Sequence, residues 1–187
     1  SVERTIWLIA GFLYVGVAAY TLAAIRFRQA MYHGSPDDGY GLTSAAVIVV
    51  AVIGVDVGAY FMGRAIGGPK IAPSISPSKT WAGYAGGALG AFLVILGYRT
   101  LSLYRIDADY GSIAFAHLLP LVIAGLIVAA IAQAGDFFES WMKRKAGVKD
   151  SSNLIPGHGG LFDRVDGLLA LAFVIGVLSI SVGMWLV

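Results

Sequence analysis

Long apolar stretches alternate with short polar segments along the whole chain. Five apolar stretches have about the twenty residues that a helix needs to cross a bilayer. They run over residues 5–24, 42–63, 81–98, 118–138 and 167–187. This pattern predicts an all-α, polytopic integral membrane protein with five transmembrane helices.

The composition supports a membrane protein and excludes several classes of function. Hydrophobic residues make up 58% of the 187-residue chain, and charged residues 13%, whereas soluble domains have roughly 25% charged residues. The net charge of +2 is too small for a face that follows a phosphate backbone, so we expect no nucleic-acid partner. The absence of cysteine excludes disulfides, zinc–thiolate sites and thiol catalysis. We interpret the first apolar stretch as a membrane helix rather than a signal peptide, because it is long enough to span and no small-residue cleavage site follows it.

The distribution of lysine and arginine predicts the orientation of the chain in the membrane. With five spans, the amino terminus lies on the same side as the loops 64–80 and 139–166. That side carries nine cations, namely Arg4, Arg64, Lys70, Lys79, Lys143, Arg144, Lys145, Lys149 and Arg164. The opposite side carries four, namely Arg26, Arg28, Arg99 and Arg105. Because cytoplasmic loops are enriched in Lys and Arg, we expect the nine-cation side to be cytoplasmic.

Two carboxylates stand at the predicted cytoplasmic end of the fourth span. Asp136 and Glu139, with Gln133, follow a spacing of three residues and therefore share one face of a helix. A carboxylate at this depth is costly unless it is paired or binds a cation. Metal ligation is one interpretation, and pairing with Lys143 or Arg144 is the other.

A second carboxylate pair, Asp163 and Asp166, opens the fifth span with the same spacing. Acidic residues stabilise a helix amino terminus, so capping alone is one interpretation. Capping does not explain two carboxylates beside a His-Gly-Gly turn. Two pairs from two helix ends form a plausible set of oxygen ligands for Mg²⁺.

Polar and glycine residues in the second and third spans have two interpretations each. Asp56, inside the second span, is either functional or hydrogen-bonded to a neighbouring helix. Gly54 and Gly58 form a GxxxG pattern that allows close approach of another helix. The third span carries overlapping patterns of the same kind at Gly83, Gly86, Gly87 and Gly90, which favour helix packing within the chain or in a homodimer.

The loop 64–80 combines cations, prolines and hydroxyl groups. Such donors on a stiff loop can bind phosphate oxygens, although an ordinary polar connector has the same composition. The loop lacks the GxxxxGK[ST] pattern of a Walker A motif.

The segment 140–166 carries a family resemblance. Its residues include Ser140, Met142, Lys143, Arg144, Lys149, Asp150, Ser152, Ile155, Pro156, His158, Gly159, Gly160, Leu161, Asp163, Arg164, Val165 and Asp166. This pattern resembles the signature of the phosphatidate cytidylyltransferases, the CDP-diacylglycerol synthases. A second block also fits that family: Asp56, Gly58, Ala59, Tyr60, Phe61, Gly63, Arg64, Ser76, Pro77, Lys79, Thr80 and Trp81. The resemblance covers about residues 50–187, and bacterial members are usually longer at the amino terminus.

The resemblance implies transfer of CMP from CTP to phosphatidate, giving CDP-diacylglycerol and pyrophosphate in phospholipid synthesis at the inner membrane, with the active site facing the cytoplasm. It implies Mg²⁺, with a second cation as an open question. The expected metal ligands are Asp136 and Asp163, supported by Asp166 and Glu139. The expected catalytic residues are Asp136, Asp163, Asp166, Lys79 and His158. The expected contacts to the substrates, CTP and the membrane lipid phosphatidate, are Ser76, Lys79, Thr80, Arg64, Lys143, Arg144, Lys149, Gly159, Gly160 and Arg164.

On this basis we divide the chain into two regions. Residues 1–41 hold the first helix and an external loop, and residues 42–187 form a catalytic membrane domain with the cytoplasmic loops 64–80 and 139–166. Two other functions stay open: a CTP-dependent polyprenol kinase, which would transfer the γ-phosphate, and a cation transporter. Transport predicts polar residues along several spans, whereas here they gather at one membrane face.

Overall fold

Five long helices form nearly all of the structure. The computed structural model describes residues 2–32, 40–105, 118–148, 151–152 and 160–181. The helices are α1 (Val2–Tyr32), α2 (Tyr40–Ala65), α3 (Trp81–Arg105), α5 (Leu118–Lys145) and α6 (Phe162–Ser181). All five are long and apolar enough to cross a membrane. The predicted five-span, all-α membrane architecture is therefore confirmed.

The helices extend beyond the predicted apolar boundaries. Helix α5 continues to Lys145, through the first part of the expected loop 139–166, and α6 begins at Phe162 rather than at residue 167. Hydrophobicity marks only the part of a helix that lies in the lipid, whereas backbone hydrogen bonding continues into the polar interface. As a result, both carboxylate pairs lie on helices, at the two helix ends where they were predicted.

The outer surface of the bundle is apolar, and its interior is built from small residues. Large side chains such as Phe12 (79% exposed), Phe27 (68%) and Leu119 (67%) point away from the protein. Exposed apolar surface of this extent suits a lipid environment. Among the described residues, the buried apolar side chains are mostly alanine, and the largest fully buried side chain is Val55.

Helices α2 and α3 pack closely because glycines face each other across their interface. A Cβ atom at Gly58 would collide with the backbone carbonyl of Gly86, and one at Gly90 would collide with that of Gly54. Close approach of this kind is the usual role of GxxxG patterns in membrane helices. The predicted packing role of these glycines within the chain is thus confirmed.

Replacement of Gly58 by Ala should lower the free energy of unfolding by about 1–3 kcal/mol, the usual cost of overpacking a well-packed interface. Thermal unfolding in detergent measures the effect. Gly97→Ala is a matched control on α3, because a Cβ at Gly97 meets no atom within 4 Å. Equal unfolding midpoints for the two variants would contradict the glycine interface.

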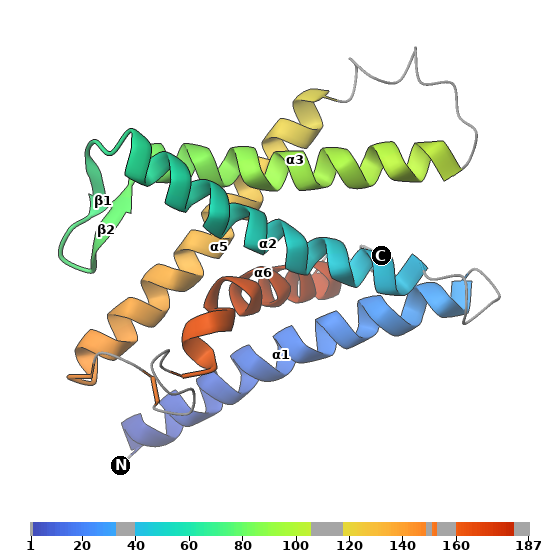
Figure 1. Ribbon diagram of the computed structural model, residues 1–187. Coiled ribbons are helices and arrows are strands. Elements are labelled where there is room, and N and C mark those ends of the chain that lie inside the picture. The colour runs from blue at the N-terminus through green and yellow to red at the C-terminus, as the bar shows by residue number, and fades with distance from the viewer. Residues whose placement is uncertain (1, 33–39, 106–117, 149–150, 153–159, 182–187) are drawn as a thin grey trace.

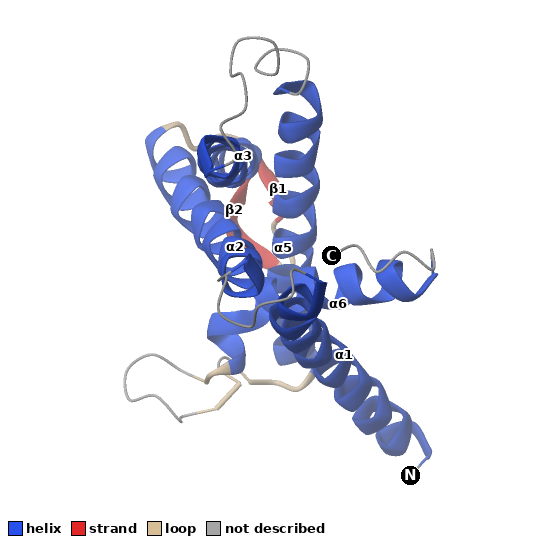
Figure 2. Ribbon diagram, turned by 90° about the vertical axis from the view of Figure 1, so that its right-hand side faces the viewer, coloured by secondary structure: helices blue, strands red, loops and turns tan. Residues whose placement is uncertain are grey.

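A two-stranded hairpin, absent from the sequence-based prediction, occupies much of the loop 64–80. Strand β1 (Lys70–Ala72) pairs antiparallel with β2 (Ser76–Thr80). Figure 2 shows these two strands in red, and they form the one sheet among the described residues. The Thr80 hydroxyl accepts a hydrogen bond from Gly83 N at 3.0 Å and so caps α3. At the other end, Arg144 Nε donates to the Ile75 carbonyl at 2.6 Å. The hairpin is therefore attached to both α3 and α5.

The helices alternate in direction, as Figure 1 shows. The start of α1, the hairpin, the end of α5 and the start of α6 all lie toward the same end of the bundle. This arrangement brings the polar segment 64–80 and the described parts of the segment 139–166 to one end of the bundle.

Candidate functional site

Helices α5 and α6 bring the two carboxylate pairs together. Their contact is close at Gly135, where a Cβ would lie 2.6 Å from the backbone carbonyl oxygen of Asp166 and 2.7 Å from Ala170 Cβ. Because Gly135 precedes Asp136 directly, the contact places Asp136 beside the first turns of α6. The predicted meeting of two acidic pairs from two helix ends is therefore observed.

The four carboxylates form a continuous acidic cluster, defined here as Asp136, Glu139, Asp163 and Asp166. Asp166 neighbours Asp136, and Glu139 neighbours both Asp163 and Asp166. Neighbouring carboxylates repel each other unless a cation or a proton lies between them. The acidic cluster is therefore built to hold positive charge.

Two lysines supply part of that charge. Lys79, on β2, forms an ion pair with Asp136. Lys143 lies 3.0 Å from Glu139 and 2.9 Å from Asp163. The alternative interpretation of Glu139, pairing with Lys143, is thus correct for one of its oxygens. The other oxygen, Glu139 Oε1, is buried and has no hydrogen-bond partner among the described residues.

Asp163 also fixes the connection between α5 and α6. Its carboxylate accepts hydrogen bonds from Gly160 N at 2.7 Å, Ser151 N at 3.1 Å and Ser151 Oγ at 3.0 Å. The bond from Gly160 N, three residues earlier, matches the backward half of a capping box. Ser151 was not predicted as a site residue, because no local pattern links positions twelve residues apart.

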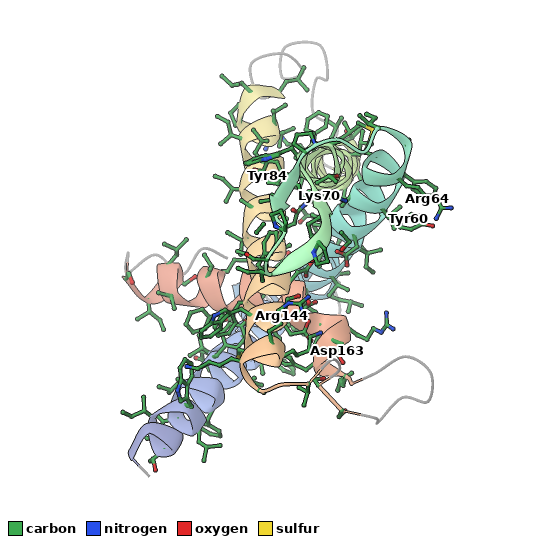
Figure 3. The ribbon with its side chains drawn as sticks, turned by 90° about the vertical axis from the view of Figure 1, so that its left-hand side faces the viewer. Tyr60, Arg64, Lys70, Tyr84, Arg144 and Asp163 are labelled. Atoms are coloured by element: carbon green, nitrogen blue, oxygen red, sulfur yellow. The ribbon has the colours of Figure 1, made fainter. Side chains whose placement is uncertain are left out.

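A polar cavity of about 440 Å³ adjoins the acidic cluster between α2, α3, α5 and the hairpin. The polar side chains that line it include Asp56, Tyr60, Arg64, Lys79, Thr80 and Gln133. Tyr60 and Arg64 lie together on the outer side of α2 (Figure 3), where Arg64 Nη1 is 3.4 Å from the Tyr60 hydroxyl. Gln133 belongs to the predicted face of α5, but its place in the cavity could not be deduced from spacing.

A second polar cavity, of about 590 Å³, lies at the end of α5. Ser140, Lys143 and Arg144 line it, together with Gly147 and Val148. Figure 3 shows Arg144 and Asp163 near each other at this end of α5. Cations border both cavities, since Lys79 and Arg64 line the first and Lys143 and Arg144 line the second.

The other predicted site residues have separate positions. Ser76 begins β2, and Arg164 is exposed on α6. The N–H of Gly160 is donated to Asp163, and its expected role toward a phosphate stays a prediction. Lys149, His158 and Gly159 lie outside the described residues.

The donor chemistry of the acidic cluster fits a hard divalent cation. Magnesium prefers carboxylate oxygens and keeps waters and phosphate oxygens as further ligands. The unpartnered Glu139 Oε1 and the excess of carboxylates over lysines agree with that chemistry. Among the described residues, no three His, Asp or Glu side chains form a ready-made metal cage.

Comparisons with known proteins identify relatives over most of the chain. Residues 1–181 match the model of the cytidylyltransferase family. A phosphatidate cytidylyltransferase of Brucella suis is 40% identical over 166 residues, which cover 89% of this chain and 54% of the relative. The proteins of the same name from Haemophilus influenzae and Bacillus subtilis are 36% and 35% identical, over 85% and 84% of this chain and 52% and 56% of the relatives. The chain therefore spans about half the length of these relatives.

Proposed function

The chain belongs to the cytidylyltransferase family, and we propose that it supplies the catalytic part of a phosphatidate cytidylyltransferase. In this reaction a phosphate oxygen of phosphatidate attacks the α-phosphorus of CTP. A new P–O bond forms, the bond between the α-phosphorus and the bridging oxygen breaks, and pyrophosphate leaves. The product is CDP-diacylglycerol.

The observation that carries the proposal is the acidic cluster, with its lysines and two polar cavities, at one end of a membrane bundle. A lipid phosphate reaches a protein at the membrane surface, and CTP reaches it from water. A site at the ends of transmembrane helices is accessible to both. The names of the relatives support the same pair of substrates.

We assign the metal to Asp136 and Asp163, with Asp166 and Glu139 as supporting ligands. A bound Mg²⁺ would neutralise phosphate charge and stabilise the leaving pyrophosphate. The side chains of this protein have a complementary task, which is to hold two polyanions together. Lys79 and Arg64 border the first cavity, and Lys143 and Arg144 border the second, so each anion has cations of its own.

The reaction needs no strong general base at the site. The attacking phosphatidate oxygen is already anionic at neutral pH, so no proton has to be removed from it. Catalysis then depends on positioning and on electrostatic stabilisation. His158, outside the described residues, is proposed to orient a phosphate oxygen rather than to accept a proton.

We further propose that the site faces the cytoplasm from the inner membrane. In the predicted five-span topology, the side of the membrane that holds the loops 64–80 and 139–166 carries nine of the thirteen lysines and arginines. The nucleotide substrate is also cytoplasmic. Orientation can be measured by reaction of single introduced cysteines with an impermeant thiol reagent, because the chain has no cysteine of its own.

The transfer itself is tested with CTP carrying a label on the α-phosphate. The intact protein that contains this chain, purified in detergent with phosphatidate and Mg²⁺, should move the label into the lipid phase. Lipid labelled from γ-labelled CTP instead, with a polyprenol as acceptor, would indicate a kinase. Absence of lipid label from either nucleotide would contradict the proposed function.

Magnesium should raise the thermal unfolding midpoint of the protein, because it relieves repulsion among the four carboxylates and binds only the folded state. The control is NaCl at equal ionic strength, which screens charge without specific coordination. Asp136→Asn should remove most of the magnesium-dependent shift. An equal shift in wild type and variant would exclude Asp136 as a ligand.

A further inference from the structure

Gln133 is a buried amide with unused hydrogen-bonding capacity. The residue is 4% exposed, and its Nε2 atom has no hydrogen-bond partner among the described residues. It lies within the membrane-spanning part of α5, twelve residues before the end of that helix. A buried amide donor without a partner costs about 1–3 kcal/mol. Stability does not explain its presence, which suggests a partner outside the chain.

The surroundings of Gln133 indicate where that partner binds. Gln133 lines the 440 Å³ polar cavity, and Asp56 of α2 lines the same cavity. This volume is within the roughly 300–1,000 Å³ typical of small-molecule sites. Asp56 is exposed to the cavity space rather than packed against a helix, so the interpretation as a helix–helix hydrogen bond loses support.

We propose that this cavity holds the pyrimidine base of the nucleotide and that Gln133 and Asp56 select cytosine over uracil. The inference rests on the proposed function and adds the residues that determine nucleotide specificity. Cytosine presents an amino donor at N4 and acceptors at N3 and O2. Uracil presents an acceptor at O4 and a donor at N3. The Asp56 carboxylate accepts from the cytosine amino group and repels the uracil O4 oxygen, while the Gln133 amide donates to cytosine N3, an atom that carries a hydrogen in uracil.

The relation of Gln133 to the acidic cluster agrees with this placement. Gln133 lies one helical turn from Asp136 along α5, about 4.5 Å along the axis. Lys79 lines the base cavity and also pairs with Asp136. A nucleotide with its base at Gln133 would therefore extend its phosphates past Lys79 toward the acidic cluster. Tyr60, 59% exposed at the cavity wall, offers an aromatic face for the base.

The test is equilibrium dialysis of labelled CTP and UTP against the intact protein in detergent, with Mg²⁺ and without lipid acceptor. We expect the wild type to prefer CTP, and Gln133→Leu to reduce that preference at least about tenfold, as expected for loss of a buried hydrogen bond. Asp56→Asn should shift the preference toward UTP, because the asparagine amide can donate to the uracil O4 oxygen.

Two comparisons make the outcome decisive. Lys79→Met should weaken the binding of CTP and of UTP by the same factor, since its proposed contact is the phosphate chain that both nucleotides share, and so leave the ratio of the two affinities unchanged. Gln133→Glu keeps the size of the side chain, so it tests the inference even if the leucine variant unfolds. In this variant the ratio of CTP affinity to UTP affinity should differ from that of the wild type. If Gln133→Glu and Asp56→Asn both keep the wild-type preference for CTP, the inference about Gln133 and Asp56 is wrong, and the proposed function is unaffected. Failure of the wild type to bind CTP would overturn the proposed function as well.

Discussion

Replacement of Asp136 by Asn should lower the rate of cytidylyl transfer by at least about 10²–10³-fold, the effect of removing one group that stabilises a transition state by charge. Asp136 is the point where the hairpin, α5 and α6 meet. It pairs with Lys79 and lies within reach of Asp166. Asparagine keeps the shape but loses the charge that would bind the metal and orient the lysine.

The folded state of Asp136→Asn should remain intact. The substitution removes an ion pair with Lys79, and it also removes repulsion from Asp166, so the two changes oppose each other. The measurement is transfer of α-phosphate label together with the thermal unfolding midpoint. Lys70→Met and Lys79→Met form a matched pair on the hairpin, because Lys70 Nζ is 3.5 Å from the Ser78 carbonyl and pairs with no carboxylate in the part of the chain that the structure describes. A large fall in transfer for both lysine variants would contradict a specific role of the Lys79–Asp136 pair.

Asp163→Asn should lose both transfer activity and stability. The carboxylate of Asp163 is a proposed metal ligand, and it also accepts hydrogen bonds from Lys143, Ser151 and Gly160. Its side chain is only 12% exposed. Loss of a charged acceptor with several donors should lower the free energy of unfolding by about 2–4 kcal/mol.

The stability of Asp163→Asn is measured by thermal unfolding, with Ser151→Ala as a comparison. The serine variant removes one donor and leaves the carboxylate, so it should unfold at an intermediate temperature and keep more of its activity. An unfolding midpoint of Asp163→Asn equal to that of the wild type would show that the connection between α5 and α6 is held in another way.

The sequence was sufficient to predict the helices and the acidic cluster, because both have local patterns. Hydrophobic length marks a span, and a spacing of three residues places Asp136 and Glu139 on one helix face. The family resemblance then linked α5 to α6. Helix ends were less accurate, since α5 and α6 continue beyond the apolar residues that the prediction used.

The features that could not be predicted depend on contacts between distant segments. The hairpin in the loop 64–80 has only a three-residue first strand and contains prolines, so its own sequence gives a weak strand signal. The bonds between Asp163 and Ser151, and the position of Gln133 in the cavity beside Asp56, exist only when several helices are assembled. Periodicity along one helix contains no information about such pairs.

The small-residue interior has a consequence for the way this protein can diverge. An outward residue such as Phe12 meets lipid, so another apolar side chain can replace it at little cost. A single added methyl group at Gly58 or Gly90 meets the backbone of the facing helix, which cannot move aside without displacing the site. Substitutions should therefore accumulate at lipid-facing positions during evolution. The glycines between α2 and α3 should stay unchanged, because they hold the two helices in the positions that the site requires.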